Sequence, residues 1–387
     1  MRTDPVATKD PVEIERSAPA EIAPVLSSRD EIRPLTGLRF WAAFWVVTAH
    51  FQPVLETLWP AARAFAPISW DGNMGVDLFF ILSGFILIYN YRETFARMSP
   101  RRYVQFLGLR LARIYPVHLF TLGLFALFVV ADQLAGPPAV RQRGVFTLYD
   151  FWEQLLLIQA WAGDPYSWNQ PSWSLSAEWF AYLLFPFLAW AIFRFGSVKA
   201  LVGTILIGVP AAWLTIEYVA APPLFPPLLR IGVTFTMGCF LGIVFLNGVG
   251  AGRKGWGAIA GATAVAIIAA SQILPDTCCA EYATVIPLMA LLIFSLGRAV
   301  GRPASWLGTD RAMFWGGASY ALYMTHWFVL AVGAVLLPAD SFASSSLLVR
   351  SLLVLVYLAA FFGAAALTFV LVERPARRRI RDALAAG

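Results

Sequence analysis

The stretch Leu35–Phe51, which reads LTGLRFWAAFWVVTAHF, is apolar over most of its length but contains one arginine and one histidine. Arg39 and His50 are eleven residues apart. On an α-helix this spacing is about 1,100° of rotation, so the two side chains share one face and lie roughly 16 Å apart along the axis. Ionisable groups inside a membrane helix are costly and usually functional. We therefore expect the rest of the chain to be organised around this face.

The composition is that of a membrane protein. Of the 387 residues, 59% are hydrophobic and 13% are charged, and the mean hydropathy is +0.67; a soluble domain is about half apolar and a quarter charged. The net charge of +6 is weak evidence for nucleic acid, because the basic residues lie in short loops between apolar runs. We therefore expect membrane lipid, and no nucleic acid, as a partner.

Ten apolar runs predict an all-α polytopic integral membrane protein with about ten transmembrane helices. The runs cover 36–57, 75–92, 108–132, 173–195, 198–218, 228–247, 255–274, 282–299, 314–337 and 348–373. Arginine and lysine are concentrated in alternate loops, which places both termini in the cytoplasm by the positive-inside rule. The predicted organisation is a disordered cytoplasmic tail over 1–34, a membrane domain over 35–373 and a basic cytoplasmic tail over 374–387.

The longest outer loop, about 133–172, is rich in aromatic residues. A short amphipathic helix is expected near Phe151–Gln159, at the outer interface. Trp161, Trp168 and Trp173 suit an aromatic belt at the membrane surface, and stacking on a sugar is the alternative interpretation.

The predicted topology converts sequence position into depth, at about 1.5 Å per residue. It arranges the polar groups of the spans in an inner layer (Arg39, Arg110 and Arg113), a middle layer (His50, Ser83 and His326) and an outer layer (Asp77 and Glu178). This order suggests a path from a cytoplasmic anion site to an outer acceptor site.

Each of these residues also has a simpler interpretation. A boundary arginine can extend its side chain to lipid headgroups, although Arg110 and Arg113, at i and i+3, share a face that favours a phosphate site. Asp77 can cap its helix or pair with a neighbour. His326 or His118 can be an interior histidine that bridges two helices, which is the preferred interpretation of His118. The three cysteines, Cys239, Cys278 and Cys279, lack metal-ligand spacing, so no metal is expected.

Six motifs resemble the membrane-bound acyltransferase 3 family, in order and over about residues 33–376. They are Arg33-Pro-Leu-Thr-Gly-Leu-Arg39 with His50, Gly75-Val-Asp77-Leu-Phe-Phe-Ile-Leu-Ser83-Gly84-Phe85, Arg110-Leu-Ala-Arg113-Ile-Tyr-Pro116, Trp173-Ser-Leu-Ser-Ala-Glu178, Ser319-Tyr-Ala-Leu-Tyr-Met-Thr-His326 and Val372-Glu373-Arg374-Pro375. The chain resembles the stand-alone form of the family, without an additional extracytoplasmic domain.

The resemblance implies an O-acyltransferase of the bacterial cell inner membrane. Its donor would be cytoplasmic acyl-CoA, with acetyl-CoA as the expected form, and its acceptor a hydroxyl of a cell-surface carbohydrate or glycolipid. The resemblance also implies an essential role for the pair Arg39 and His50. A non-enzymatic transporter or flippase for a lipid-linked sugar is the alternative.

The site residues can then be given roles. We expect Arg39, Arg110 and Arg113 to bind the donor phosphates, and His50 to act as general base or, in a competing mechanism, as an acylated nucleophile. Asp77 and Glu178 would orient the acceptor or the imidazole. Ser83, His326 and Trp173 would support the substrate.

Overall fold

The computed structural model describes residues 30–95, 99–135, 146–161, 164–194, 197–204, 226–273 and 278–386, and in this part of the chain the secondary structure is entirely helical. The long helices are α1 (Arg33–Leu58), α3 (Gly75–Phe95), α4 (Pro100–Ala135), α6 (Trp173–Ile192), α9 (Pro226–Leu246), α10 (Trp256–Ile273), α11 (Cys278–Arg298), α13 (Asp310–Leu336) and α14 (Leu347–Thr368). The shorter helices are α2 (Ala66–Trp70), α5 (Leu148–Leu156), α7 (Ser197–Gly203), α12 (Ala304–Leu307) and α15 (Arg374–Ala386).

Seven of the described helical segments are long and apolar enough to cross a membrane. The helix α1 is not one of these seven, because Arg39, His50 and Gln52 lower its hydropathy, although it is 26 residues long. Helix α11 contains a shorter apolar segment, Thr284–Arg298. The prediction of a polytopic helical membrane protein is therefore confirmed, whereas the number ten is not established.

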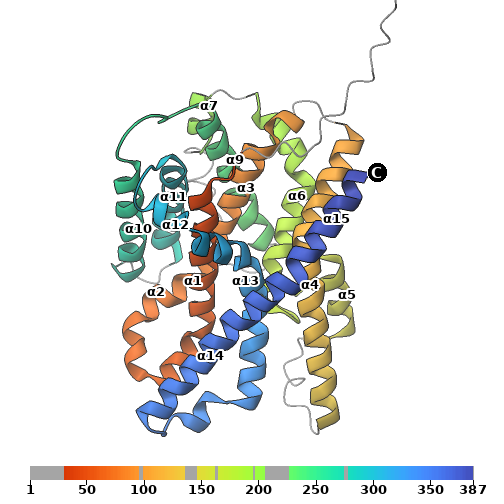
Figure 1. Ribbon diagram of the computed structural model, residues 1–387, viewed down its shortest axis with the longest axis vertical. Helices are drawn as coiled ribbons and strands as arrows, with labels where there is room; N and C mark the ends of the chain where they lie inside the picture. The colour runs from red at the N-terminus through yellow and green to blue at the C-terminus, as the bar shows by residue number, and fades with distance from the viewer. Residues whose placement is uncertain are drawn as a thin grey trace, which may run out of the picture.

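Parts of the sequence predictions fall outside the described residues. They are most of the tail 1–34 and most of the span 198–218, of which only the segment up to residue 204 is described. Figure 1 shows the first turn of α1 and the last turn of α15 toward the same, upper end of the bundle. The side of the membrane on which this end lies remains a prediction.

Helix α1 forms the centre of the bundle and packs against α3, α11, α12, α13 and α14 (Figure 1). Two glycines allow its backbone to approach its neighbours. A Cβ atom on Gly37 would collide with the carbonyl oxygen of Leu307, and one on Gly316 of α13 would collide with that of Thr36. Small residues at such crossings are typical of membrane helices, whose association depends on close packing. The face that carries Arg39 and His50 is thereby fixed against α13.

Helices α3 and α9 form the most extensive helix pair. Gly84 of α3 and Gly238 of α9 lie against backbone, because a Cβ atom on either would collide with a carbonyl oxygen of the partner helix, Phe235 or Ile81 respectively. This packing fixes the rotation of α3, and so determines which of its polar residues face the centre of the bundle.

The short helix expected near Phe151–Gln159 is α5, which begins slightly earlier. Thr147 caps it by accepting a hydrogen bond from the backbone N–H of Asp150 at 3.0 Å, and the helix ends where Leu157 adopts a left-handed conformation. Trp168 is buried and donates to the carbonyl oxygen of Thr147 at 3.0 Å. The interpretations of Trp168 as an aromatic-belt or sugar-stacking residue are therefore wrong.

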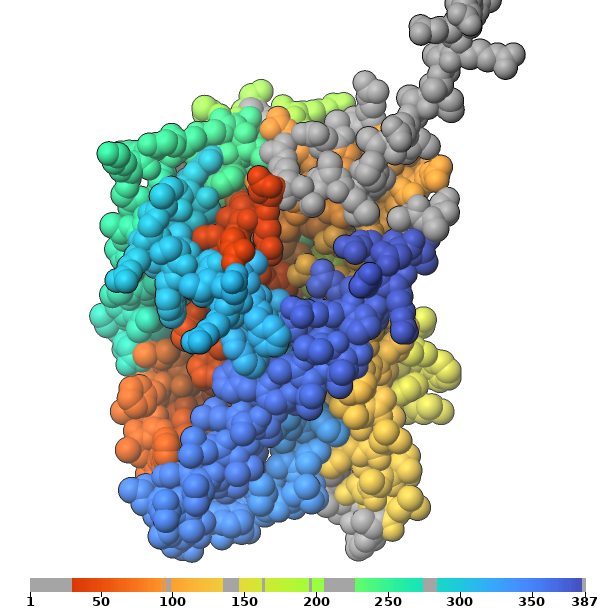
Figure 2. Space-filling view, in the orientation of Figure 1, coloured from red at the N-terminus to blue at the C-terminus, as the bar shows by residue number. Residues whose placement is uncertain are grey.

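The C-terminal segment predicted as a basic tail contains the helix α15. A π-helical turn, Phe369–Glu373, joins α14 to α15. Figure 2 shows α14 and α15, in blue, crossing one face of the molecule diagonally, and α15 packs against α4.

Candidate functional site

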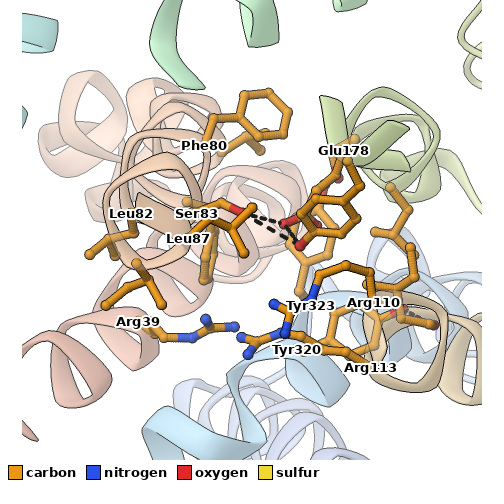
Figure 3. A pocket seen from close by; sticks show the side chains of 17 residues that line it. Arg39, Phe80, Leu82, Ser83, Leu87, Arg110, Arg113, Glu178, Tyr320 and Tyr323 are labelled. Atoms are coloured by element: carbon orange, nitrogen blue, oxygen red, sulfur yellow. Dashed lines mark hydrogen bonds between the residues drawn. The ribbon is translucent and has the colours of Figure 1, made fainter. Parts of the chain in front are cut away.

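A cavity lies among α1, α3, α4, α6 and α13. Its polar lining is drawn in Figure 3 and consists of Arg39, Ser83, Arg110, Arg113, Ser174, Glu178, Tyr182, Tyr320 and Tyr323. The cavity thus brings together five of the predicted site residues, Arg39, Ser83, Arg110, Arg113 and Glu178, from four helices.

The three arginines converge on one side of this cavity (Figure 3). Arg39 lies over the ring of Phe79, at 5.5 Å from its centroid, and Arg110 donates to the hydroxyl of Tyr91 at 2.9 Å. Within the described residues, none of the three arginines forms an ion pair. The three arginines are partly buried. Because like charges repel and charges shielded from water require partners, this arrangement is suited to an anion.

Opposite the arginines, Glu178 accepts two hydrogen bonds. Ser83 donates to Oε1 of Glu178 at 2.9 Å, and the hydroxyl of Tyr182 donates to the same oxygen. Ser83 and Glu178 are therefore at one level, and the prediction that they occupy different layers is wrong. The prediction assumed that this span begins at the outer surface of the membrane. However, the residues that precede α6, Pro171 and Ser172, are already buried.

His50 and His326 form a pair beside the cavity. Nδ1 of His50 lies 2.9 Å from Nε2 of His326, and the ring of Trp327 meets His50 edge-on at 5.0 Å. His326 is fully buried, whereas His50 is partly exposed. The prediction that both histidines lie at one depth is confirmed.

His50 is not among the residues that line the cavity. The connection between the two is Tyr323, which lines the cavity and whose ring centroid is 6.0 Å from that of His326. The hydroxyl of Tyr323 lies 2.8 Å from that of Ser174 and donates to the carbonyl oxygen of Pro171 at 2.8 Å.

Asp77 lies away from the cavity, in a buried ion pair with Arg230 of α9. The guanidinium of Arg230 donates to both carboxylate oxygens, at 2.7 and 2.5 Å. Its Nη2 also donates to the carbonyl oxygen of Asn73 at 2.9 Å, and the guanidinium lies over the ring of Trp173 at 5.4 Å. Of the two interpretations of Asp77, capping or pairing, this geometry matches pairing. A role in orienting the acceptor stays a prediction without a contact to support it.

The remaining candidates have structural surroundings. Nε2 of His118 lies 2.7 Å from the carbonyl oxygen of Gln154, so His118 connects α4 to α5, as predicted for an interior bridge. Cys239 is buried in the core. In the described part of the chain, no group of three or more His, Cys, Asp or Glu side chains is placed to hold a metal ion.

Three tyrosines of the site were not predicted from the sequence. Tyr182 is four residues after Glu178, a spacing that puts the two on one helix face. Tyr320 and Tyr323 belong to the motif that ends in His326. The sequence also held a signal for the partner of Asp77. Arg230 is a basic residue at the end of an apolar run where few charged residues occur.

The chain is similar in sequence to known acyltransferases. An acyltransferase from Streptomyces mycarofaciens, MdmB, is 28% identical over 372 residues, which are 89% of this chain and 91% of that protein. No solved structure gives a significant match. Residues 33–373 match the family described as the acyltransferase domain. The match extends from the start of α1 to the π-helical turn before α15, and the chain therefore belongs to the acyltransferase 3 family of multi-pass membrane proteins.

Proposed function

We propose that the protein is a membrane O-acyltransferase that moves an acyl group, with acetyl as the expected form, from cytoplasmic acyl-CoA to a hydroxyl of a cell-surface carbohydrate or glycolipid. The proposed location is the bacterial cell inner membrane. The family and the Streptomyces relative support acyl transfer. The observation that carries the choice of donor is the convergence of Arg39, Arg110 and Arg113 on one cavity, where none of them forms an ion pair with a carboxylate of the described part of the chain.

Coenzyme A combines phosphate groups at one end with a thioester at the end of an extended arm. Guanidinium groups bind phosphate by charge-assisted, often bidentate hydrogen bonds. Arg110 is held in place by its hydrogen bond to Tyr91 and by three aromatic rings. A guanidinium group that is already fixed in this way loses little conformational entropy when it binds an anion.

The arm of the donor would extend along α1 toward His50. The helix is continuous from Arg33 to Leu58, so Arg39 and His50 remain on one face, roughly 16 Å apart. This separation supports a site in which the phosphates and the thioester contact opposite ends of the same helix face.

His50 would act as a general base, with His326 as its positioning residue. If Nδ1–H of His50 donates to Nε2 of His326, Nε2 of His50 carries the lone pair. This nitrogen would take the proton of the acceptor hydroxyl while the oxygen attacks the thioester carbonyl. The thiolate of coenzyme A would leave with that proton. General-base catalysis contributes typically about 10²–10⁴ in rate.

An acyl-His50 intermediate is the competing mechanism. It predicts that donor alone labels the protein, in a form that acceptor removes. Direct transfer predicts no such labelled species.

The test of the proposed function uses protein purified in detergent and acyl-CoA with a labelled acyl group. Transfer to acceptor, or slow hydrolysis of the donor without acceptor, is expected in the absence of any gradient. A transporter or flippase for a lipid-linked sugar would do neither. Mass spectrometry of surface glycans and lipids from cells with and without the protein would identify the acceptor by its lost acyl mass.

A further inference from the structure

A second hollow, with a volume of about 840 Å³, lies between α4 and α15. It is lined by six arginines, namely Arg110 and Arg113 of α4 and Arg374, Arg377, Arg378 and Arg381 of α15, together with Tyr91, Leu109 and Ala112. None of these lining residues is acidic. Because Arg110 and Arg113 also line the central cavity, the two spaces adjoin.

Helix α15 is held at this position by contacts at both ends. Near its start, the guanidinium of Arg374 lies over the ring of Phe369 at 4.4 Å, and Arg377 pairs with the buried Glu373 at 3.3 Å. Near its end, Leu384 lies against Gly108 of α4, where a Cβ atom would come within 3.0 Å of the leucine side chain. The orientation of its basic face is therefore fixed.

The spacing of the arginines matches this orientation. At 100° per residue, Arg374, Arg377, Arg378 and Arg381 fall within about 100° of one another around the helix, whereas Arg379 lies roughly 100° beyond the nearest of them. Asp382 pairs with Arg378 and Arg381 at 3.8 and 3.7 Å. These pairs are exposed, and such pairs contribute little, so both arginines can exchange this partner for a ligand.

A third hollow, of about 1070 Å³, shares Arg113 and Arg377 with the arginine hollow of α4 and α15. It is lined by Arg39, Arg113 and Arg377, but also by Asp30, Glu31 and Glu373. Its mixed charge is less favourable to a polyanion than the arginine hollow of α4 and α15. Charge alone thus favours entry of a polyanion past α15.

We propose that α15 is part of the donor site, and that its arginine face binds the phosphorylated nucleotide end of the acyl donor while the arm passes Arg110 and Arg113 into the central cavity. The inference rests on the proposed function, since it concerns the donor of the same reaction. It assigns a binding role to Arg378 and Arg381.

The same face could instead bind the phosphate of an anionic lipid, because basic helices at membrane surfaces do so. The two sources of phosphate differ in one respect. A donor contact changes the affinity for acyl-CoA only, whereas a lipid contact changes the protein's response to the membrane. The experiment separates them by changing the donor and the lipid independently.

The test uses the variant with Arg378→Gln and Arg381→Gln in the full chain, reconstituted in nanodiscs, with acyl-CoA and with acyl-pantetheine, which lacks phosphate. Both arginines are largely exposed, so their loss does not remove packing. The expected result is a rise of about tenfold in KM for acyl-CoA, an unchanged kcat and an unchanged KM for acyl-pantetheine. Arg379→Gln, on the same helix but outside the hollow, is the matched control and should behave as wild type.

Two results would overturn the proposal. One is a double variant that transfers from acyl-CoA with the KM of the wild type. The other is a change in KM that is equal for acyl-CoA and acyl-pantetheine and appears only in nanodiscs that contain phosphatidylglycerol. That result would show that the two arginines bind lipid. A wild-type protein that transfers from neither donor would instead contradict the proposed function itself, so the two failures are distinguishable.

Discussion

The buried ion pair between Asp77 and Arg230 gives a prediction that separates structure from catalysis. Asp77 is 1% exposed and the side chain of Arg230 is 15% exposed, and the contact is bidentate. We expect Asp77→Asn to destabilise the protein, because Arg230 loses the buried carboxylate to which two of its nitrogen atoms donate. Breaking one side of a buried pair typically costs about 3–5 kcal/mol.

The size of the effect can be tested by a double-mutant cycle. The double variant Asp77→Leu with Arg230→Met removes both charges, and we expect it to be more stable than either single variant, because no unpaired charge remains. The assay is thermal unfolding in detergent, where each single variant should lower the unfolding temperature by about 4–6 °C. Asp340→Asn, at an exposed carboxylate, is the control and should unfold like the wild type.

The same variants measure catalysis. We expect acyl transfer per folded molecule to be retained in Asp77→Asn, because Asp77 does not line the central cavity. A variant that unfolds at the wild-type temperature but has lost transfer would refute this reasoning and return Asp77 to a catalytic role.

Three further predictions concern the site and its frame. His326→Phe should lower kcat about 10- to 100-fold with little change in donor KM, because it removes the hydrogen bond that positions His50; His326→Gln should restore part of the rate, and a wild-type rate in the phenylalanine variant would contradict a positioning role. Glu178→Gln should lower the KM for acyl-CoA several-fold, because it removes the carboxylate that shares the cavity with the arginines, and a raised KM in donor titrations would contradict this sign. Gly238→Val should lower the yield and thermal stability of the folded protein, because the added side chain meets the backbone of α3, whereas Gly232→Ala on the same helix has open space and should not.

The relative level of some residues along the bundle could be predicted from the sequence, because apolar runs indicate where each helix begins. The inner arginines, Arg39, Arg110 and Arg113, were placed in one layer and line one cavity. His50 and His326 were placed at one depth and form a pair. These agreements follow from the constant rise of an α-helix.

Rotation around each helix could not be predicted, because apolar spans carry little periodic signal. Asp77 and Ser83 are six residues apart, which is about 240° around α3. Ser83 therefore faces the cavity while Asp77 faces Arg230 of α9. The deciding contact is the glycine-mediated packing of α3 on α9, which involves residues distant in sequence.

The predicted level of Glu178 along the bundle was wrong for a related reason. The depth rule assumes that a span begins at the membrane surface, but α6 follows a short buried 3₁₀ turn, Gln170–Ser172. Likewise, the basic segment after residue 373 carried a clear charge signal, but its packing on α4 depends on Gly108 and Leu384, which no local pattern connects.

The proposed mechanism depends on His50 as the residue that carries the acyl-transfer chemistry. The direct measurement is acyl transfer from labelled acyl-CoA by purified His50→Ala protein, with folding checked by gel filtration and thermal unfolding. We expect the variant to be folded and to bind acyl-CoA with nearly the wild-type affinity, because the arginine cavity is intact, but to transfer at least about 10²-fold more slowly. A folded His50→Ala protein that transfers at the wild-type rate would contradict it.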